Sequence, residues 1–166
     1  MRDDNLEVYF TNIMPDGTRL GSDVRITFDP SQSDGPSIVF AQNAYAIAWR
    51  DARGDGSGLY FARISRDGTK LVDDTSVTSE SASYAYPSIA YSGSEYAVVW
   101  CDSRNETSEI YFARISSGGT NLGGDVRLTN APEWSSKPFI VHAEDYYAVA
   151  WMDAAARRGG WSRSNR

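Results

Sequence analysis

The sequence repeats itself every 51 residues, and three copies follow one another without a gap. Fourteen positions carry the same residue in all three copies. A Tyr-Phe pair, a Gly-Thr pair, a proline and a Trp-x-Asp triplet all keep this spacing. The tryptophans are Trp49, Trp100 and Trp151, and the aspartates that follow them are Asp51, Asp102 and Asp153. A strict period of this length indicates a repeat architecture, in which each copy buries its apolar face against the next copy.

Composition narrows the classes of protein that this chain can belong to. The 166 residues suit one domain, and 41% of them are hydrophobic, which is enough for a packed core. The net charge of −6 argues against nucleic acid and anionic membrane surfaces as partners, because both require clustered Lys and Arg. The sequence contains no apolar run of membrane-spanning length, and residues 1–5 have no apolar signal core. The compartment is left open.

Each copy contains four short segments with extended character, and none has helical spacing over a useful length. In the middle copy these segments are residues 59–64, 74–78, 87–91 and 96–100. Asp67-Gly68 predicts a hairpin turn between the first two. The second segment is polar and reads as an edge strand, and the third is so apolar that we expect it to be buried on both faces.

Four strands in about 50 residues fit one blade of a β-propeller. The residue pattern of the repeat resembles that of the blades of bacterial sialidase-like propellers. The resemblance is carried by Ile-Tyr-Phe-Ala-Arg-Ile at 110–115, Pro-Ser-Ile-Ala at 87–90 and Tyr-Ala-Val-Val-Trp-x-Asp-x-Arg at 96–104, and it covers residues 6–153. The sialidase Asp box is absent, because the turn at 65–69 is shorter and Gly118 stands where the third copy would need its Asp. The resemblance therefore implies the fold and assigns no catalytic residue.

Propellers close with typically four to eight blades, so three units are too few for a ring. By analogy with propellers, the Pro-Ser-Ile segment is the innermost strand A, and the other three segments are strands B, C and D. Residues 5–28 then supply strands C and D only, residues 36–78 and 87–129 are complete blades, and residues 138–152 supply A and B only. We therefore expect an all-β fold, a β-propeller with three four-stranded blade equivalents per chain. The expected partner is a second copy, in which residues 5–28 complement residues 138–152 of the other chain and give a homodimeric six-bladed ring.

The repeat covers a domain of residues 5–153, and the pattern fails in a basic, Gly-rich tail at 154–166. This tail reads as a frayed end or as a basic arm that contacts a partner.

Loops between strands D and A and between B and C share one face of a propeller, around the mouth of its channel, where ligands commonly bind. The expected loops between B and C are residues 51–58 and 102–109. Aromatic rings there stack on sugars, and carboxylates accept hydrogen bonds from hydroxyl groups. The repeated Asp has a structural alternative, in which it accepts backbone N–H groups of its own loop in an Asx-type turn. The candidate ligand-binding residues at the channel mouth are Asp51, Arg53, Asp102, Arg104, Tyr84, Tyr86 and Trp134.

These features favour a non-catalytic binding or assembly module that takes a glycan or a small polar ligand at the ring mouth. The alternatives are a sialidase-like glycoside hydrolase and a truncated propeller gene product with no specific activity. Whether the chain is an enzyme stays open, although a carboxylate repeated in every unit suits scaffold better than a single catalytic site. With one histidine and one cysteine, His142 and Cys101, no His or Cys cluster for zinc exists, and no metal or cofactor is expected. His142 matches Phe40 and Tyr91, so we expect it to pack as a ring.

Overall fold

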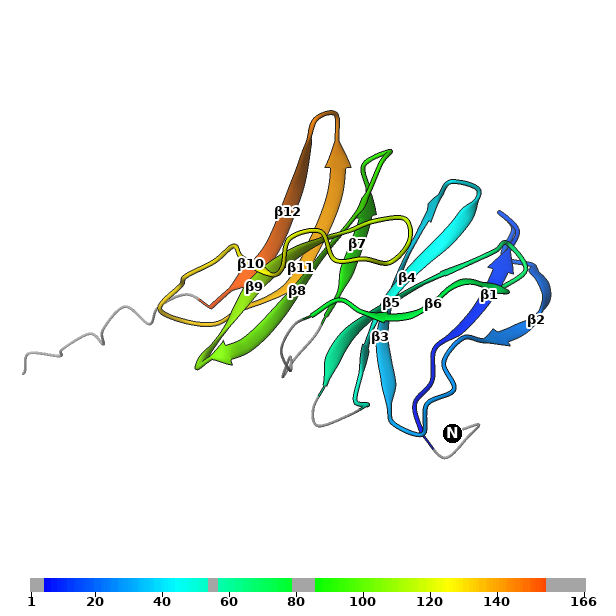
Figure 1. The fold of residues 1–166 in the computed structure, drawn as a ribbon, viewed down its shortest axis with the longest axis horizontal. Helices are drawn as coiled ribbons and strands as arrows, with labels where there is room; N and C mark the ends of the chain where they lie inside the picture. The colour runs from blue at the N-terminus through cyan, green and yellow to red at the C-terminus, as the bar shows by residue number, and fades with distance from the viewer. Residues whose placement is uncertain (1–4, 54–56, 79–85, 155–166) are drawn as a thin grey trace, which may run out of the picture.

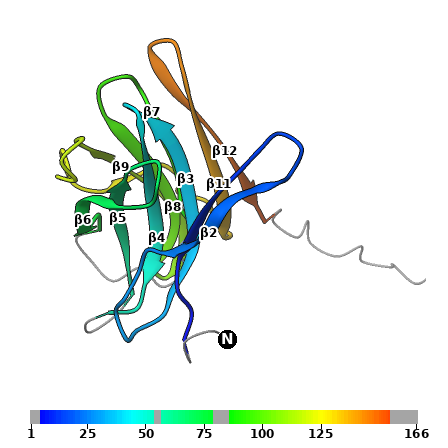
Figure 2. The same cartoon turned by 90° about the vertical axis from the view of Figure 1, so that its right-hand side faces the viewer.

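The chain folds entirely into β-strands. A computed structural model describes residues 5–53, 57–78 and 86–154. Within these ranges twelve strands form four antiparallel sheets, which hold two, four, four and two strands in order along the chain. The all-β prediction is therefore confirmed. Figure 1 shows the sheets side by side in chain order, and Figure 2 gives the view from the β1–β2 end of this row.

Every connection within a sheet joins strands that are adjacent in sequence. The first sheet pairs β1 (Tyr9–Ile13) with β2 (Arg19–Arg25). The second contains β3 (Ser33–Ala41), β4 (Ala44–Asp51), β5 (Gly58–Ile64) and β6 (Lys70–Ser76). The third contains β7 (Ser88–Tyr91), β8 (Tyr96–Asn105), β9 (Thr107–Ile115) and β10 (Val126–Arg127). The fourth pairs β11 (Ser135–Ala143) with β12 (Tyr146–Asp153).

The hairpin turn predicted in each repeat is present. Gly17, Gly68 and Gly119 have φ angles of 86°, 89° and 88°, a left-handed conformation that glycine adopts without a steric penalty. In the middle turn the Gly68 amide donates to the Ser65 carbonyl at 3.0 Å, and the Ser65 amide donates to the Thr69 carbonyl at 2.8 Å. The strand after the turn begins earlier than predicted, at Lys70 in β6, because pairing with Ile64 resumes directly after the turn.

Two further predictions need correction. Residues 102–109 were expected to form a loop, but β8 and β9 continue through them as one hairpin that closes at Glu106. The proline-led segment was expected to be buried on both faces. That holds for Ser88–Ala90 in β7, which lies between two neighbouring sheets, but it is wrong for β3 and β11. Ile38 and Phe139 are exposed there because no inner strands of another described sheet lie beyond β3 at one end of the row or beyond β11 at the other.

The core consists of three apolar clusters, one at each boundary between successive sheets. Each boundary repeats a contact between a Tyr ring and two other rings, with centroids 4.8–5.8 Å apart. At the last boundary the Tyr147 ring packs against the rings of Phe112 and His142. His142 therefore packs as a ring, as predicted. The triplets are Phe10, Phe40 and Tyr45; Phe61, Tyr91 and Tyr96; and Phe112, His142 and Tyr147.

Candidate functional site

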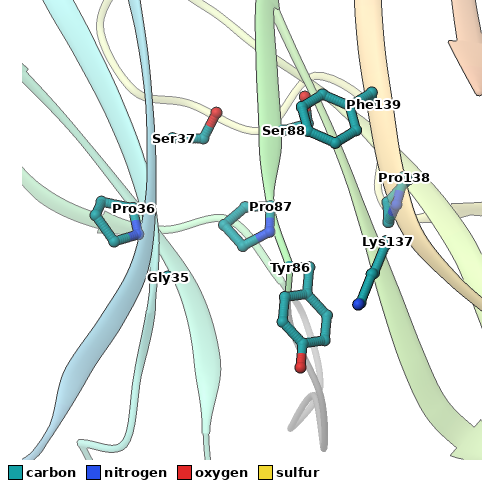
Figure 3. A pocket seen from close by; sticks show the side chains of 9 residues that line it. All are labelled: Gly35, Pro36, Ser37, Tyr86, Pro87, Ser88, Lys137, Pro138 and Phe139. Atoms are coloured by element: carbon teal, nitrogen blue, oxygen red, sulfur yellow. The ribbon is translucent and has the colours of Figure 1, made fainter. Parts of the chain in front are cut away.

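A groove lies where the proline-led segments of three successive sheets come together. Its volume is about 320 Å³, and each repeat contributes the same three consecutive positions to its lining. Figure 3 shows the three prolines in a row, with the side chains of Tyr86 and Lys137 extending to one side of it. We call this site the proline groove. Its lining residues are Gly35, Pro36, Ser37, Tyr86, Pro87, Ser88, Lys137, Pro138 and Phe139.

The prolines fit at this place because β3 and β11 are interrupted just before them. The pairing register shifts between Asp34 and Ser37 in β3, and between Ser136 and Phe139 in β11. Proline lacks an amide hydrogen, so it is tolerated where the ladder of hydrogen bonds is broken. The residue before the proline carries a positive φ in both strands, 60° at Gly35 and 50° at Lys137. These irregularities hold the groove open at the start of the strands.

Two of the repeated aspartates, Asp51 in β4 and Asp102 in β8, form internal clamps. The Asp51 carboxylate accepts hydrogen bonds from Ser33 Oγ at 3.0 Å, from Trp49 Nε1 at 3.0 Å and from the Arg53 amide at 2.9 Å. The last bond is the expected Asx-turn bond. The Arg53 guanidinium bridges Asp51 at 2.6 Å and Asp74 at 3.0 Å, with its Cζ 4.3 Å from the centre of the Tyr60 ring. One cation thus ties the end of β4 to β5 and β6.

The second four-stranded sheet in the chain repeats this clamp. Arg104 donates from its amide and Nε to Asp102 at 2.9 and 2.7 Å, and it pairs with Asp125 at 2.9 Å. Its Cζ lies 4.6 Å from the centre of the Tyr111 ring. Asp51 and Asp102 are both fully buried. Their carboxylates are therefore occupied within the protein and are not free to act as acid and base on a ligand.

Burial and hydrogen bonding oppose one another at two buried carboxylates, Asp51 and Glu109. Burial raises the pKa of Asp51, but hydrogen bonds from Arg53, Trp49 and Ser33 outweigh it and hold the pKa below its ordinary value. Burial likewise raises the pKa of Glu109, and hydrogen bonds from Thr129 and Arg127 bring it below the ordinary value. The hydrogen bond to Asp51 raises the pKa of Arg53, with a further contribution from Asp74. Asp51 and Glu109 are therefore ionised at neutral pH.

This predicts that stability is lost in acid. A carboxylate whose folded pKa is depressed stabilises the fold above its unfolded pKa, and this contribution disappears as the pH falls through the folded pKa. With ordinary values of 3.8 for Asp51 and 4.5 for Glu109, urea unfolding should give a steady free energy down to about pH 5 and a decline below about pH 4. The Asp51→Asn variant should be less stable at pH 7 and show a shallower decline. An equally steep decline in that variant would contradict the assignment to Asp51.

The structure distributes the predicted mouth residues over two places. Asp51, Arg53, Asp102 and Arg104 belong to the clamps, whereas Tyr86 is half exposed and lines the proline groove. Trp134 is also exposed and directly precedes β11, and Tyr84 lies outside the described residues. Sequence reasoning did not select Lys137 and Phe139. Both depart from the repeat, because Lys137 matches Gly35 in the first copy and Phe139 matches Ser37 and Ser88, and that departure was the available signal.

Comparison with known proteins adds no assignment: no family model matches the chain, and no curated protein or solved structure is significantly similar to it. The resemblance to sialidase-like propellers therefore stays a prediction. Among the described residues, no group of three or more His, Cys, Asp or Glu side chains is placed to hold a metal ion. The same part of the chain contains no helix long and apolar enough to cross a membrane.

Proposed function

We propose that the chain is a non-catalytic binding module with a β-propeller fold, in which two copies form a ring of six four-stranded sheets. In this ring, β11 and β12 of one protomer are continued by β1 and β2 of its partner. The proposal rests on one observation. The first and last sheets are complementary halves of the same repeat, and they expose apolar residues that the two complete sheets bury.

Identical residues at identical repeat positions differ in exposure. Trp151 is 45% exposed, whereas Trp49 and Trp100 are 0% exposed. In the complete sheets these tryptophans stack on a Tyr of the adjacent strand, with ring centroids 6.2 Å apart for Trp49–Tyr60 and 6.0 Å for Trp100–Tyr111. On β12 no described strand follows, so no such Tyr lies beside Trp151. The equivalent Tyr of the repeat is Tyr9 on β1, and a partner chain would supply it.

The same contrast occurs on the opposite half. Ile13 is 65% exposed, whereas its equivalents Ile64 and Ile115 are 0% exposed. Those two isoleucines lie opposite Tyr45 and Tyr96 in the paired strand. The third Tyr of that series is Tyr147 on β12. Full burial of an Ile side chain stabilises by about 1.5–3 kcal/mol, so these open positions favour association with the matching half.

The uncovered face of the last sheet points to the same arrangement. Ala148 and Ala150 on β12 are exposed, but the equivalent Ala46 and Ala48 on β4 are fully buried against the next sheet. In that boundary Ile89 belongs to the same cluster as the two alanines. Its equivalent in the first copy, Ile38, is half exposed. Ile38 of the partner would cover Ala148 and Ala150.

The repeat fixes the register of the proposed junction. The two complete sheets pair Trp49 with Tyr60 and Trp100 with Tyr111. Extending this register by one repeat sets Trp151 opposite the partner's Tyr9 and Val149 opposite the partner's Thr11. We therefore expect the variant that carries both Thr11→Cys and Val149→Cys to form a covalent dimer under mild oxidation, seen as a doubled mass on a non-reducing gel.

The matched control is the pair Asn12→Cys and Val149→Cys, which is slipped by one residue. A one-residue slip sends the two side chains to opposite faces of the sheet, so this pair should not cross-link. The native Cys101 is buried, and burial raises the pKa of its thiol, so it should not compete. Equal cross-linking of both pairs would contradict the register.

The unmodified chain gives a direct test of the ring. Light scattering of the 18.3 kDa chain should report twice that mass. A mass of one chain at micromolar concentration would overturn the dimer.

The ligand site of this module is the proline groove. In a two-fold ring the grooves of both protomers surround one channel mouth, with half-exposed Tyr86 rings and proline faces available for apolar ring faces. Such a surface suits a glycan or another small polar ligand. Titration of a sugar panel, followed by NMR of labelled tyrosine, should shift Tyr86, and Tyr86→Ala should abolish binding. Binding that survives this substitution would remove the groove as the site.

A further inference from the structure

We infer that the channel mouth binds a small dianion, such as sulfate or a dicarboxylate, between Lys137 of one protomer and the partner's Lys137. The inference rests on the proposed ring. Of the nine residues that line the proline groove, Lys137 is the charged one. No described residue forms an ion pair with its ammonium group, in contrast to Lys70, which pairs with Asp74. Figure 3 shows the Lys137 side chain extending to the same side of the groove as Tyr86, where a bound ligand would meet its ammonium group.

The backbone at Lys137 supports a role for its side chain. Its φ angle is 50°, a left-handed conformation that costs a residue with a Cβ more than it costs glycine. At the equivalent position of the first copy stands Gly35, with a φ of 60°. A lysine here is less favourable for folding than the glycine that the same bulge accepts in β3. Strain of this kind that persists in a groove points to function.

Symmetry sets the charge of the ligand. Around the proposed ring the positions before the prolines follow the order Gly35, Tyr86, Lys137, and then the same order in the partner. Two ammonium groups and two phenol groups thus surround the mouth, related by the two-fold axis. A dianion on or near this axis accepts hydrogen bonds from both ammonium groups, and the flanking Tyr86 hydroxyls can donate as well. A monoanion leaves one ammonium group uncompensated.

The test uses the whole chain and sodium sulfate as the probe, with sodium chloride adjusted to constant ionic strength. Calorimetry should give one sulfate per dimer, and sodium acetate should bind at least tenfold more weakly. Lys137→Met should weaken sulfate binding at least tenfold, whereas Lys137→Arg should retain it. The control Arg114→Met removes one positive charge from a half-exposed side chain outside the groove, and it should bind sulfate as the unmodified chain does.

The Lys137→Gly variant adds a second measurement, the unfolding temperature, which loss of the lysine charge alone would not raise. This variant should lose sulfate binding and yet unfold at a higher temperature, because glycine relieves the left-handed backbone. A dimer that binds no sulfate, or that binds it equally well after Lys137→Met, would overturn the dianion site and leave the ring intact. A monomeric chain would overturn the ring itself, so the two failures are distinguishable by mass.

Discussion

Replacing Ala150 by Glu is expected to convert the proposed dimer into monomers. In the single chain Ala150 is exposed, so a glutamate there stays hydrated and leaves the fold intact. In the ring the same position becomes buried like Ala48, which is 0% exposed. A buried charge without a partner costs about 3–5 kcal/mol, and the two-fold ring buries one at each of its two junctions, so the dissociation constant should rise by at least about 10,000-fold. Sedimentation equilibrium over a range of concentrations measures this change.

The matched control is Leu71→Glu. Leu71 is exposed, and so are its repeat equivalents Leu20 and Leu122. This leucine is therefore exposed even in the two repeats that have all four strands. The ring therefore buries none of them, and a glutamate at this position should leave the dissociation constant within about threefold of the unmodified chain. An Ala150→Glu chain that dimerises as well as Leu71→Glu would show that the open face of β12 is not the contact surface. Circular dichroism of both variants should match that of the parent chain.

Much of the fold could be predicted because the same pattern of turn and strand residues occurs three times in the sequence. The Asp-Gly and Gly-Gly turns fix where the hairpins close, and the Tyr-Ala-x-x-Trp segments fix which strands lie at the centre of a sheet. At 102–109 the three copies did not distinguish strand from loop: a loop was expected, but the chain continues as a hairpin. What the repeat could not give was the burial of β3 and β11. The burial of β3 and β11 depends on whether the inner strands of another sheet pack beside them, and the residues of the strands do not indicate this.

The candidate site was harder to predict, because it depends on contacts between distant repeats. Asp51 looked like a mouth carboxylate, but it is buried against Ser33, which is 18 residues earlier in the chain and has Tyr84 as its counterpart in the second copy. Lys137 and Phe139 matter because three proline-led segments lie side by side, which no local pattern shows. In a repeat protein the shared residues build the scaffold. The positions that break the repeat are therefore the better guide to ligand contacts.

The Asp102 clamp should be a large single contributor to the stability of one protomer. Its carboxylate is fully buried and holds Trp100 Nε1 at 3.5 Å and Arg104 Nε at 2.7 Å. Asp102→Ala removes one ion-pair partner of the mostly buried Arg104 guanidinium, which keeps its pair with Asp125. Breaking a buried pair typically costs 3–5 kcal/mol, and the retained Asp125 contact places our expectation at the lower end, about 3 kcal/mol. Urea unfolding in the Ala150→Glu background measures this loss without the contribution of the dimer.

Asp153→Ala in the same background is the matched comparison. Asp153 occupies the same repeat position and accepts hydrogen bonds from Ser135 Oγ at 2.6 Å and Trp151 Nε1 at 2.9 Å, but it is exposed and the arginine two residues later is replaced by Ala155. Exposed hydrogen bonds of this kind contribute about 1 kcal/mol or less. Because both substitutions remove a carboxylate next to a Trp, the difference between them isolates burial and the arginine. Equal losses would mean that Asp102 stabilises the chain only through the Trp contact, and the clamp would then have no special role in joining β8 to the strands outside it.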